Sequence, residues 1–350
     1  MASEKNLALV FQKVPSGLPV AGEHLTIEDR GYDPSASPPA GGLVVQTIYA
    51  SYDPYMRGRM RAPEKKSYSP AFTLNEPITS YCVSRVLKSD STDYSEGDLL
   101  VGVGIPVQQY ASLPKEILEK ARKIDPSTAL KDLRNYIGPL GMPGLTAYSS
   151  FYEIGKPKKG EVIFISSAAG AVGQIVGQLA KHEGLTVLGS VGSDEKLNFL
   201  TEDLGFDGGF NYKKEKPLDA LKRLAPDGID IYYENVGGEH LEAALETLRN
   251  NGRIVGCGMV SQYNLPENQQ YGIKNLFHIT TKNLTFRGFI VGTPDFGPKY
   301  DKEHQENVSK WIAEGKFKVS FSETEGIKNG PEGFIGMLQG KNFGKAVLKL

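Results

Sequence analysis

The chain has 350 residues, 39% of them hydrophobic, which is enough for about two domains that each bury a packed core. Its 40 Lys and Arg residues balance 41 Asp and Glu residues, and the net charge of −1 argues against nucleic acid or an anionic membrane as partners. Two cysteines are too few for a disulfide framework and favour a reducing compartment. We expect no signal peptide or membrane-spanning segment, and therefore predict a cytoplasmic protein.

The first 110 residues predict short strands joined by turns. Runs of β-branched and aromatic residues between polar, glycine-rich or proline-rich turns indicate strands at 43–49, 80–87 and 99–103. Residues 64–77 are polar and contain prolines, which predicts a loop or lid. An apolar strand is expected at 346–350, and it can pair back with the N-terminal strands. The first domain would then be discontinuous in sequence.

From about Gly138 onward, predicted strands alternate with predicted helices. Strands are expected at 161–165, 185–191, 229–233, 253–260 and 284–291, and helices at 171–183, from Ser193 to 204, at 239–248 and at 304–313. Such alternation is typical of βαβ units. The predicted fold class is therefore α/β, with a Rossmann-type, doubly wound parallel sheet and a further β domain.

A glycine turn at residues 166–173, reading SSAAGAVG, lies between a predicted strand and a predicted helix. Gly170 would let the backbone approach a pyrophosphate, Gly173 would let the helix pack tightly on the strand, and the helix N-terminus would present free N–H groups. Ala168 replaces the first glycine of the common pattern, so a tight turn without a ligand remains the alternative. The cofactor-binding positions assigned here are Ala168, Gly170, Ala171, Val172 and Gly173.

The end of the second predicted strand distinguishes NAD from NADP. NAD-binding proteins usually carry a carboxylate there, roughly 20 residues past the glycines. Here residues 188–193 read LGSVGS without a carboxylate, and Lys196 follows. A lysine attracts a 2′-phosphate, which a carboxylate would repel, so we predict NADP as the cofactor. The alternative for Lys196 is an ordinary solvated helix residue.

No catalytic metal site is predicted. Such a site needs about three Cys, His or carboxylate ligands in workable geometry, and the histidines form neither an HxH nor an HExxH pattern. His182 and His240 are expected on exposed parts of helices. The histidines considered are His24, His182, His240, His278 and His304. An oxidoreductase without a metal must stabilise a developing oxyanion by hydrogen bonds.

Tyrosines beside turns are the candidate hydrogen-bond donors, although most of the 17 tyrosines are expected to be packing residues. Tyr55 follows a predicted strand, and Tyr81 begins another. Tyr263 follows the predicted strand 253–260. Because the carboxyl ends of parallel strands face the ligand crevice, Tyr263 has a positional reason to belong to a site.

Taken together, these residues resemble the zinc-independent medium-chain dehydrogenase/reductases. The resemblance runs over essentially the whole chain and is strongest to the group that holds plant alkenal double-bond reductases and leukotriene dehydrogenase/prostaglandin reductases. Besides the glycine turn, it is carried by Asp53-Pro54-Tyr55-Met56-Arg57, Tyr81-Cys82-Val83-Ser84-Arg85-Val86, Gly141-Met142-Pro143-Gly144-Leu145-Thr146-Ala147-Tyr148, Gly192-Ser193-Asp194-Glu195-Lys196, Asn211-Tyr212-Lys213, Glu234-Asn235-Val236-Gly237-Gly238, Ser261-Gln262-Tyr263-Asn264 and Gly340-Lys341-Asn342-Phe343-Gly344-Lys345.

The resemblance implies a GroES-like catalytic domain formed by residues 1–137 and 320–350, and a Rossmann NADP-binding domain formed by residues 138–319, with the active site between them. It implies that Lys196 and Tyr212 hold the 2′-phosphate, and that Tyr55, Tyr81 and Tyr263 line the substrate pocket. Further cofactor-binding positions are Gly192, Ser193, Asn235, Cys257, Tyr263 and Asn342. A homodimer is also implied.

The implied reaction is hydride transfer from NADPH to the β-carbon of an α,β-unsaturated aldehyde or ketone. Tyr263 would be catalytic, donating a hydrogen bond to the oxygen of the developing enolate. Two alternatives remain, namely an NADPH-dependent quinone oxidoreductase and a non-catalytic NADP-binding protein. Ser80, Cys82 and residues 101–106 depart from the plant-like pattern near the implied pocket, so the substrate stays open. For Cys82, a small buried hydrophobe is favoured over a reactive thiol.

Overall fold

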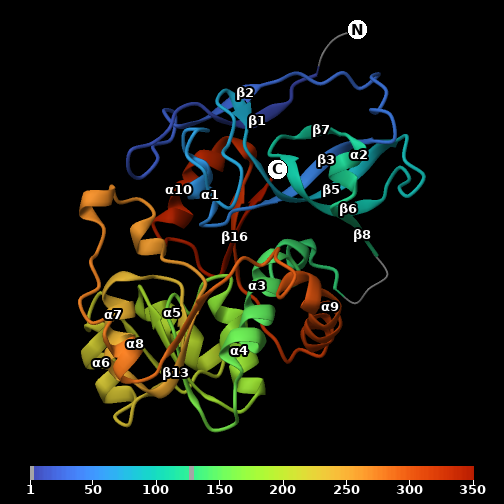
Figure 1. Ribbon diagram of the computed structural model, residues 1–350. Coiled ribbons are helices and arrows are strands. Elements are labelled where there is room, and N and C mark those ends of the chain that lie inside the picture. The colour runs from blue at the N-terminus through green and yellow to red at the C-terminus, as the bar shows by residue number, and fades with distance from the viewer. Residues whose placement is uncertain (1–3, 126–129) are drawn as a thin grey trace. The chain divides into compact units, whose positions relative to one another are not determined.

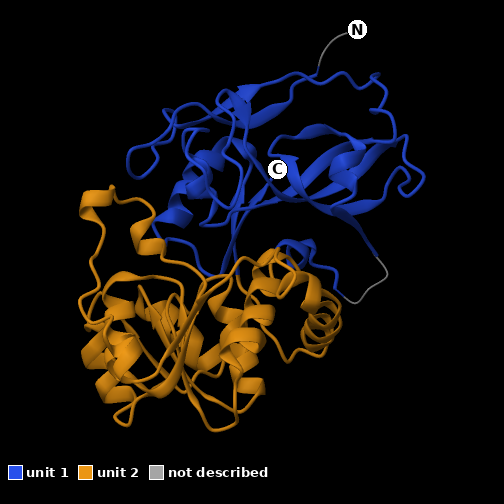
Figure 2. Ribbon diagram, in the orientation of Figure 1, with its two compact units in different colours: residues 1–137, 321–350 blue, residues 138–320 orange. Residues whose placement is uncertain are grey.

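The computed structural model describes residues 4–125 and 130–350, and the chain divides into two compact units (Figures 1 and 2). Unit 1, blue in Figure 2, contains the chain up to Ile137 together with Phe321–Leu350. Unit 2, orange in Figure 2, is Gly138–Ser320. Each unit has a hydrophobic core of its own.

Unit 2 is built on a parallel sheet with the strand order β11-β10-β9-β12-β13-β14 in the described chain. The strands are β9 (Val162–Ile165), β10 (Thr186–Val191), β11 (Gly208–Asn211), β12 (Ile229–Glu234), β13 (Leu248–Gly256) and β14 (Thr285–Gly288). The chain runs outward from β9 in one direction and returns to β12 on its other side. The carboxyl ends of β9 and β12 therefore flank the topological switch point, where ligands bind in open α/β sheets.

Helices accompany the strands of unit 2 in the alternation predicted from the sequence (Figure 1). They are α3 (Met142–Ser150), α4 (Gly173–His182), α5 (Asp194–Asn198), α6 (Pro217–Leu224), α7 (Gly238–Thr247), α8 (His278–Thr281) and α9 (Gly297–Ala313). Short π-helical turns extend α3 over Phe151–Gly155 and α5 over Phe199–Asp203. The apolar face predicted for α4 is buried, because Ile175, Val176 and Leu179 have no exposed surface.

Unit 1 contains two sheets in its described residues. The larger has the order β15-β16-β3-β5-β6-β8, with β7 also paired to β3, and the smaller has the order β2-β1-β4. The strands are β1 (Leu7–Phe11), β2 (Leu25–Asp29), β3 (Leu43–Ser51), β4 (Glu76–Pro77), β5 (Thr79–Ser89), β6 (Leu99–Pro106), β7 (Tyr110–Leu113), β8 (Ala121–Ile124), β15 (Phe321–Glu325) and β16 (Lys345–Lys349). The short helices α1 (Met56–Arg59) and α2 (Lys115–Leu118) and the longer α10 (Gly330–Leu338) complete the unit.

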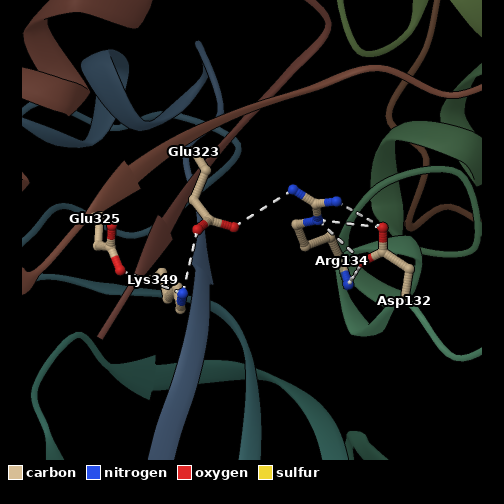
Figure 3. Close-up of polar contacts among 5 residues, drawn as sticks. All are labelled: Asp132, Arg134, Glu323, Glu325 and Lys349. Carbon is tan, nitrogen blue, oxygen red and sulfur yellow. Dashed lines mark hydrogen bonds and ion pairs between the residues drawn. The ribbon is translucent and has the colours of Figure 1, made fainter.

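The C-terminal strand pairs with the N-terminal part of unit 1, as predicted. β16 runs antiparallel to β3 and parallel to β15. A cluster of charged residues adds to this attachment (Figure 3). Arg134 lies 2.8 Å from the carboxylate of Asp132 and 3.4 Å from that of Glu323, and Lys349 contacts both Glu323 and Glu325. The two ends of the chain thus build one unit.

Several element boundaries differ from the sequence prediction. β13 ends at Gly256 instead of 260, because the N–H groups of Cys257 and Gly258 both turn to the carbonyl oxygen of Glu234 and leave the ladder. β14 ends at Gly288, where its last pair with β13 forms, instead of 291. α9 begins at Gly297, seven residues before its predicted start. The loop predicted over 64–77 ends in the two-residue strand β4.

His240 was expected on an exposed helix face, and that prediction is wrong. Its side chain is only 6% exposed, because α7 lays the imidazole on an aromatic stack formed by Phe164 and Phe210, with Tyr212 at its edge. Burial lowers the pKa of His240 to about 4, so the ring is neutral. His182 is exposed, as expected, and lies against Trp311.

Candidate functional site

The turn from Ser166 to Gly173 connects β9 to α4 and requires glycine at its end. A Cβ at position 173 would lie 2.5 Å from the carbonyl oxygen of Ser167 and 2.8 Å from that of Ala168. Such distances are far below van der Waals contact, so only glycine lets α4 start this close to the strand. Ser167 itself adopts a left-handed conformation with φ of 52°, and its carbonyl accepts the N–H of Gly170 at 2.9 Å.

Ala168, which departs from the usual glycine pattern, is accommodated by the neighbouring strand. Its side chain is fully buried, and a Cβ at position 189 of β10 would come within 2.7 Å of the Ala168 methyl group. Gly189 therefore supplies the space that Ala168 takes up. This compensation shows why alanine at position 168 leaves the turn intact.

The N-terminus of α4 offers donors to an anion. In the described chain, the N–H groups of Ala171 and Val172 have no backbone acceptor, whereas the N–H of Gln174 donates to the carbonyl oxygen of Gly170. The N-cap residue Val172 has no capping side chain. Free N–H groups and the helix dipole together make this terminus suitable for a phosphate group.

A second group of predicted residues gathers at the end of β10. Ser193 caps α5 by accepting the N–H of Lys196 at 3.3 Å. A Cβ at position 192 would lie 3.0 Å from the hydroxyl of Tyr212, so Gly192 lets that phenol close over the strand end. The structure thereby brings Gly192, Ser193, Lys196 and Tyr212 together. Asp194, the nearby acid, is engaged by Asn211 and Lys214 instead.

Lys213 is a further member of this group, which was not predicted from the sequence. Burial lowers the pKa of Lys196, and the positive charge of Lys213 lowers it further, so the two ammonium groups lie close enough to repel each other. Two cations gathered at the end of β10 suit a dianionic phosphate. The signal was present in the sequence, because Lys213 directly follows Tyr212, but a single lysine could not be distinguished from a solvated one.

At the switch point, Asn235 links the end of β12 to the end of β9. Its side-chain amide donates to the carbonyl oxygen of Ser166 at 2.8 Å, and its backbone N–H donates to the Ser166 hydroxyl at 2.9 Å. Asn235 thus braces the first residue of the glycine turn. Any direct contact between its side chain and a cofactor stays a prediction.

Tyr263 follows a 3-10 turn, Val260–Gln262, and does not follow the strand directly. Its hydroxyl accepts the backbone N–H of Met259 at 3.3 Å and lies beside Gly258, where a Cβ would come within 2.9 Å. A phenol can donate one hydrogen bond while its oxygen accepts another, so Tyr263 has the chemistry of a hydrogen-bond donor. Cys257, one step before Gly258, has its pKa raised to about 12 by burial and is therefore a neutral thiol.

In unit 1, Tyr55 and Tyr81 lie close enough for their charges to interact. Tyr55 is the N-cap residue of α1, and Tyr81 lies near the start of β5. Burial raises the pKa of both phenols, and the carboxylate of Asp53 raises both further, so both are protonated donors at neutral pH. Asn342, the remaining predicted position, donates to the carbonyl of Gly344 within its own loop.

Ser80 and Cys82 point away from the face that presents Tyr81. They are 1% and 0% exposed, and the Ser80 hydroxyl donates to the carbonyl of Ser51. Successive side chains of a strand alternate between its faces, which places these two in the core. Burial raises the pKa of the Cys82 thiol, which agrees with a buried hydrophobe and contradicts a reactive thiol.

The described residues contain no group of three or more His, Cys, Asp or Glu side chains that could hold a metal ion. Within residues 4–125 and 130–350, no helix is long and apolar enough to cross a membrane.

Comparisons with known proteins place this geometry in a family. The model described as zinc-binding dehydrogenase matches residues 171–313, and the model described as N-terminal domain of oxidoreductase matches residues 8–121. The chain is 52% identical to the NADP-dependent oxidoreductase RED1 of Cochliobolus heterostrophus, over 99% of this chain and 98% of that protein. The chain belongs to the medium-chain dehydrogenase/reductases.

This medium-chain dehydrogenase/reductase is also 44% identical to the NADP(+)-dependent 2-alkenal reductase of Nicotiana tabacum, over 87% of this chain and 86% of that one. Among solved structures, it resembles CurA of Vibrio vulnificus in complex with NADPH, with a TM-score of 0.86, 30% identity and 98% of each chain covered. The predicted fold class and the predicted cofactor are confirmed. The chain is an NADP-dependent oxidoreductase.

Proposed function

We propose that this enzyme reduces the carbon–carbon double bond of α,β-unsaturated aldehydes or ketones. The observation that carries the proposal is the position of the Tyr263 hydroxyl, which accepts the Met259 N–H at 3.3 Å and lies beside Gly258. It lies in the segment that follows β13, at the carboxyl edge of the parallel sheet. The similarity to the tobacco 2-alkenal reductase supports the same substrate class.

Bound NADPH would supply the hydride that adds to the β-carbon of the substrate, and a proton from water would complete the reduction at the α-carbon. Tyr263 would hydrogen-bond the carbonyl oxygen as negative charge develops on it, and the Met259 N–H would orient the phenol. The α4 N-terminus would hold the pyrophosphate, and Lys196 with Lys213 would hold the 2′-phosphate. Tyr55 and Tyr81 would offer further phenolic donors to the substrate.

Replacing Tyr263 by Phe tests the mechanism. Loss of one donor to a developing oxyanion removes about 3 kcal/mol of transition-state stabilisation, so kcat for an enone should fall on the order of 100-fold. NADPH oxidation is followed by stopped-flow absorbance with an enone and, separately, with a quinone. Tyr271→Phe, which alters an exposed tyrosine bonded to Glu242, is the matched control and should retain full turnover.

An unchanged kcat in the Tyr263→Phe enzyme would remove the oxyanion role from this residue. NADPH loss with the quinone alone would establish the rival activity of a quinone oxidoreductase. An absence of turnover with every unsaturated acceptor, despite tight NADPH binding, would support the non-catalytic alternative.

Cofactor choice has its own test in Lys196. The Lys196→Ala variant should raise the KM for NADPH at least tenfold and the KM for NADH little, because only NADPH carries the 2′-phosphate. Lys213→Ala should act in the same direction with a smaller effect. The exposed Lys214, which pairs with Asp194, is the control. Equal effects of Lys196→Ala on the two cofactors would contradict the phosphate role.

A further inference from the structure

Glu234 is a buried carboxylate at the switch point of the sheet, and the catalytic proposal does not use it. It is the last residue of β12, and its side chain has no exposed surface. A charged group is costly to bury unless hydrogen bonds compensate for the lost water. The hydrogen bonds that surround this side chain therefore indicate its role.

One oxygen of the Glu234 carboxylate collects all of the contacts in the described chain. Its Oε1 atom accepts the N–H groups of Val236 at 2.6 Å and Gly237 at 2.8 Å, and the hydroxyl of Tyr232 at 2.9 Å. The Ser166 hydroxyl lies 3.4 Å from the same atom. The other oxygen, Oε2, is buried and has no partner among the described residues.

These contacts place an internal anion at the start of α7. Gly237 is the N-cap of that helix and has a left-handed φ of 77°, which turns its N–H toward the carboxylate. An anion is stabilised at a helix N-terminus by free N–H groups and by the helix dipole. Burial raises the pKa of the Glu234 carboxyl, whereas the N–H groups of Gly237 and Val236 lower it. The Glu234 carboxylate therefore lies at the N-terminus of α7, in the kind of position that a bound phosphate would take at the N-terminus of α4.

Glu234 also joins the loops that follow β9, β12 and β13. Its side chain touches Ser166, which begins the glycine turn and accepts the N–H of Asn235. Its carbonyl oxygen accepts the N–H groups of Cys257 and Gly258, which lead to Tyr263. Three loops that carry candidate cofactor or catalytic positions therefore meet at one residue.

We propose that Glu234 is a positioning residue for NADPH, whose side chain closes the N-terminus of α7 and shapes the 235–238 loop beside the glycine turn. Two helices begin at the switch point, α4 after β9 and α7 after β12. Because the Val236 and Gly237 N–H groups just before α7 already bond to Glu234, the N–H groups just before α4 are the ones left for the pyrophosphate. The inference rests on NADP binding and not on the proposed enone chemistry.

The test measures NADPH affinity without any substrate, by the fluorescence of the bound cofactor. Glu234→Ala should raise the Kd for NADPH at least tenfold, because the Val236 and Gly237 donors lose their acceptor and the loop relaxes. Glu234→Gln keeps an acceptor oxygen at the Oε1 position and should restore the Kd to within about threefold of wild type. Glu239→Ala, which removes an exposed carboxylate from the first turn of the same helix, is the matched control and should leave the Kd unchanged.

Hydrogen exchange supplies a second measurement. Exchange of the Val236 and Gly237 amides should accelerate in Glu234→Ala and remain near wild type in Glu234→Gln, with β9 and β10 protected in both. If Glu234→Ala does not fold, Tyr232→Phe serves instead, because it removes one donor to the same oxygen. This variant should raise the Kd for NADPH two- to fivefold and slightly accelerate amide exchange in the 235–238 loop.

Two results would overturn the proposal. One is an unchanged NADPH Kd in Glu234→Ala, or in Tyr232→Phe where the alanine variant is unfolded. The other is a Kd in Glu234→Gln as poor as in Glu234→Ala although Val236 and Gly237 stay protected. Failure of enone turnover with an intact affinity pattern would instead count against the proposed reaction alone.

Discussion

The imidazole of His240 illustrates how one buried residue makes stability depend on pH. Its ring lies 6.4 Å from the ring of Phe164 and 6.3 Å from that of Phe210, and its Nε2 atom is buried without a partner in the described chain. Burial lowers its pKa to about 4, whereas a histidine in an unfolded chain has a pKa of about 6.5. Between these values, the unfolded state binds the proton and the folded state does not.

The free energy of unfolding should therefore fall as the pH drops from about 6.5 toward 4, and the contribution of His240 to this loss is on the order of 3 kcal/mol. The sign follows because a lowered folded-state pKa stabilises the fold above the unfolded pKa. His240→Phe keeps a ring in the aromatic stack and removes the titrating group. The free energy of unfolding of this variant should therefore depend less on pH in this range. Urea unfolding at a series of pH values measures the difference, and parallel curves for the two proteins would contradict the prediction.

At the scale of the element, α4 contacts both the candidate pyrophosphate site and the segment 318–320, where the chain leaves unit 2 for unit 1. Its N-terminus begins at the glycine turn. Further along, Gln178 bonds to both backbone groups of Lys318, and Gln174 bonds to both backbone groups of Ser320. These paired amide contacts hold the extended segment against the helix as a neighbouring strand would. The position of α4 is therefore set by the glycine turn and by these side-chain contacts of Gln174 and Gln178.

Shifting the start of α4 should weaken cofactor binding. Gly173→Ala would place a methyl group 2.5 Å from the Ser167 carbonyl oxygen, so the helix must move away from β9. We expect the Kd for NADPH to rise at least tenfold, with a loss of stability of about 1–3 kcal/mol. Gly292→Ala, at a position with open space around it, is the control. Calorimetric titration with NADPH checks the prediction, and equal affinities in the two variants would refute it.

At the scale of the whole molecule, unit 1 depends on residues from both ends of the chain. Lys345 of β16 is 1% exposed, and its ammonium group donates to the carbonyl oxygens of Tyr52 and Ala346 and lies 3.3 Å from the carboxylate of Asp53. Asp53, the acidic member of this buried pair, lies two residues before Tyr55. The charged cluster around Arg134 makes a similar connection near solvent (Figure 3).

The buried Lys345–Asp53 pair and the exposed Arg134 cluster should contribute very different amounts to the free energy of unfolding. Lys345→Met leaves the Asp53 carboxylate buried without its cation and should cost about 3–5 kcal/mol of stability. Adding Asp53→Asn should recover part of that loss. Arg134→Ala breaks contacts that water screens and should cost about 1 kcal/mol or less. Chemical denaturation compares the variants, and similar losses for Lys345→Met and Arg134→Ala would contradict this ranking.

The local pattern of the sequence was sufficient for the alternation of strands and helices, the glycine turn and the start of α5 at Ser193. Each depends on residues close together in the chain, such as Gly173 beside Ser167, or Ser193 three residues before Lys196. The preference for NADP could also be predicted from the sequence, because one short segment contains Lys196 and lacks the carboxylate that is usual in NAD-binding proteins. The resemblance supplied candidate roles for Tyr55, Tyr81 and Tyr263, and those roles remain predictions.

Contacts between distant segments decided the rest. The compensation of Ala168 by Gly189, the burial of His240 and the second cation at Lys213 each arise where segments distant in the sequence come together. The sequence by itself determined the family, the cofactor and the glycine turn, since backbone conformation and charge along a short segment control these. Only the tertiary structure decided that Glu234 faces the start of α7, because burial and hydrogen-bond partners depend on which parts of the chain pack together.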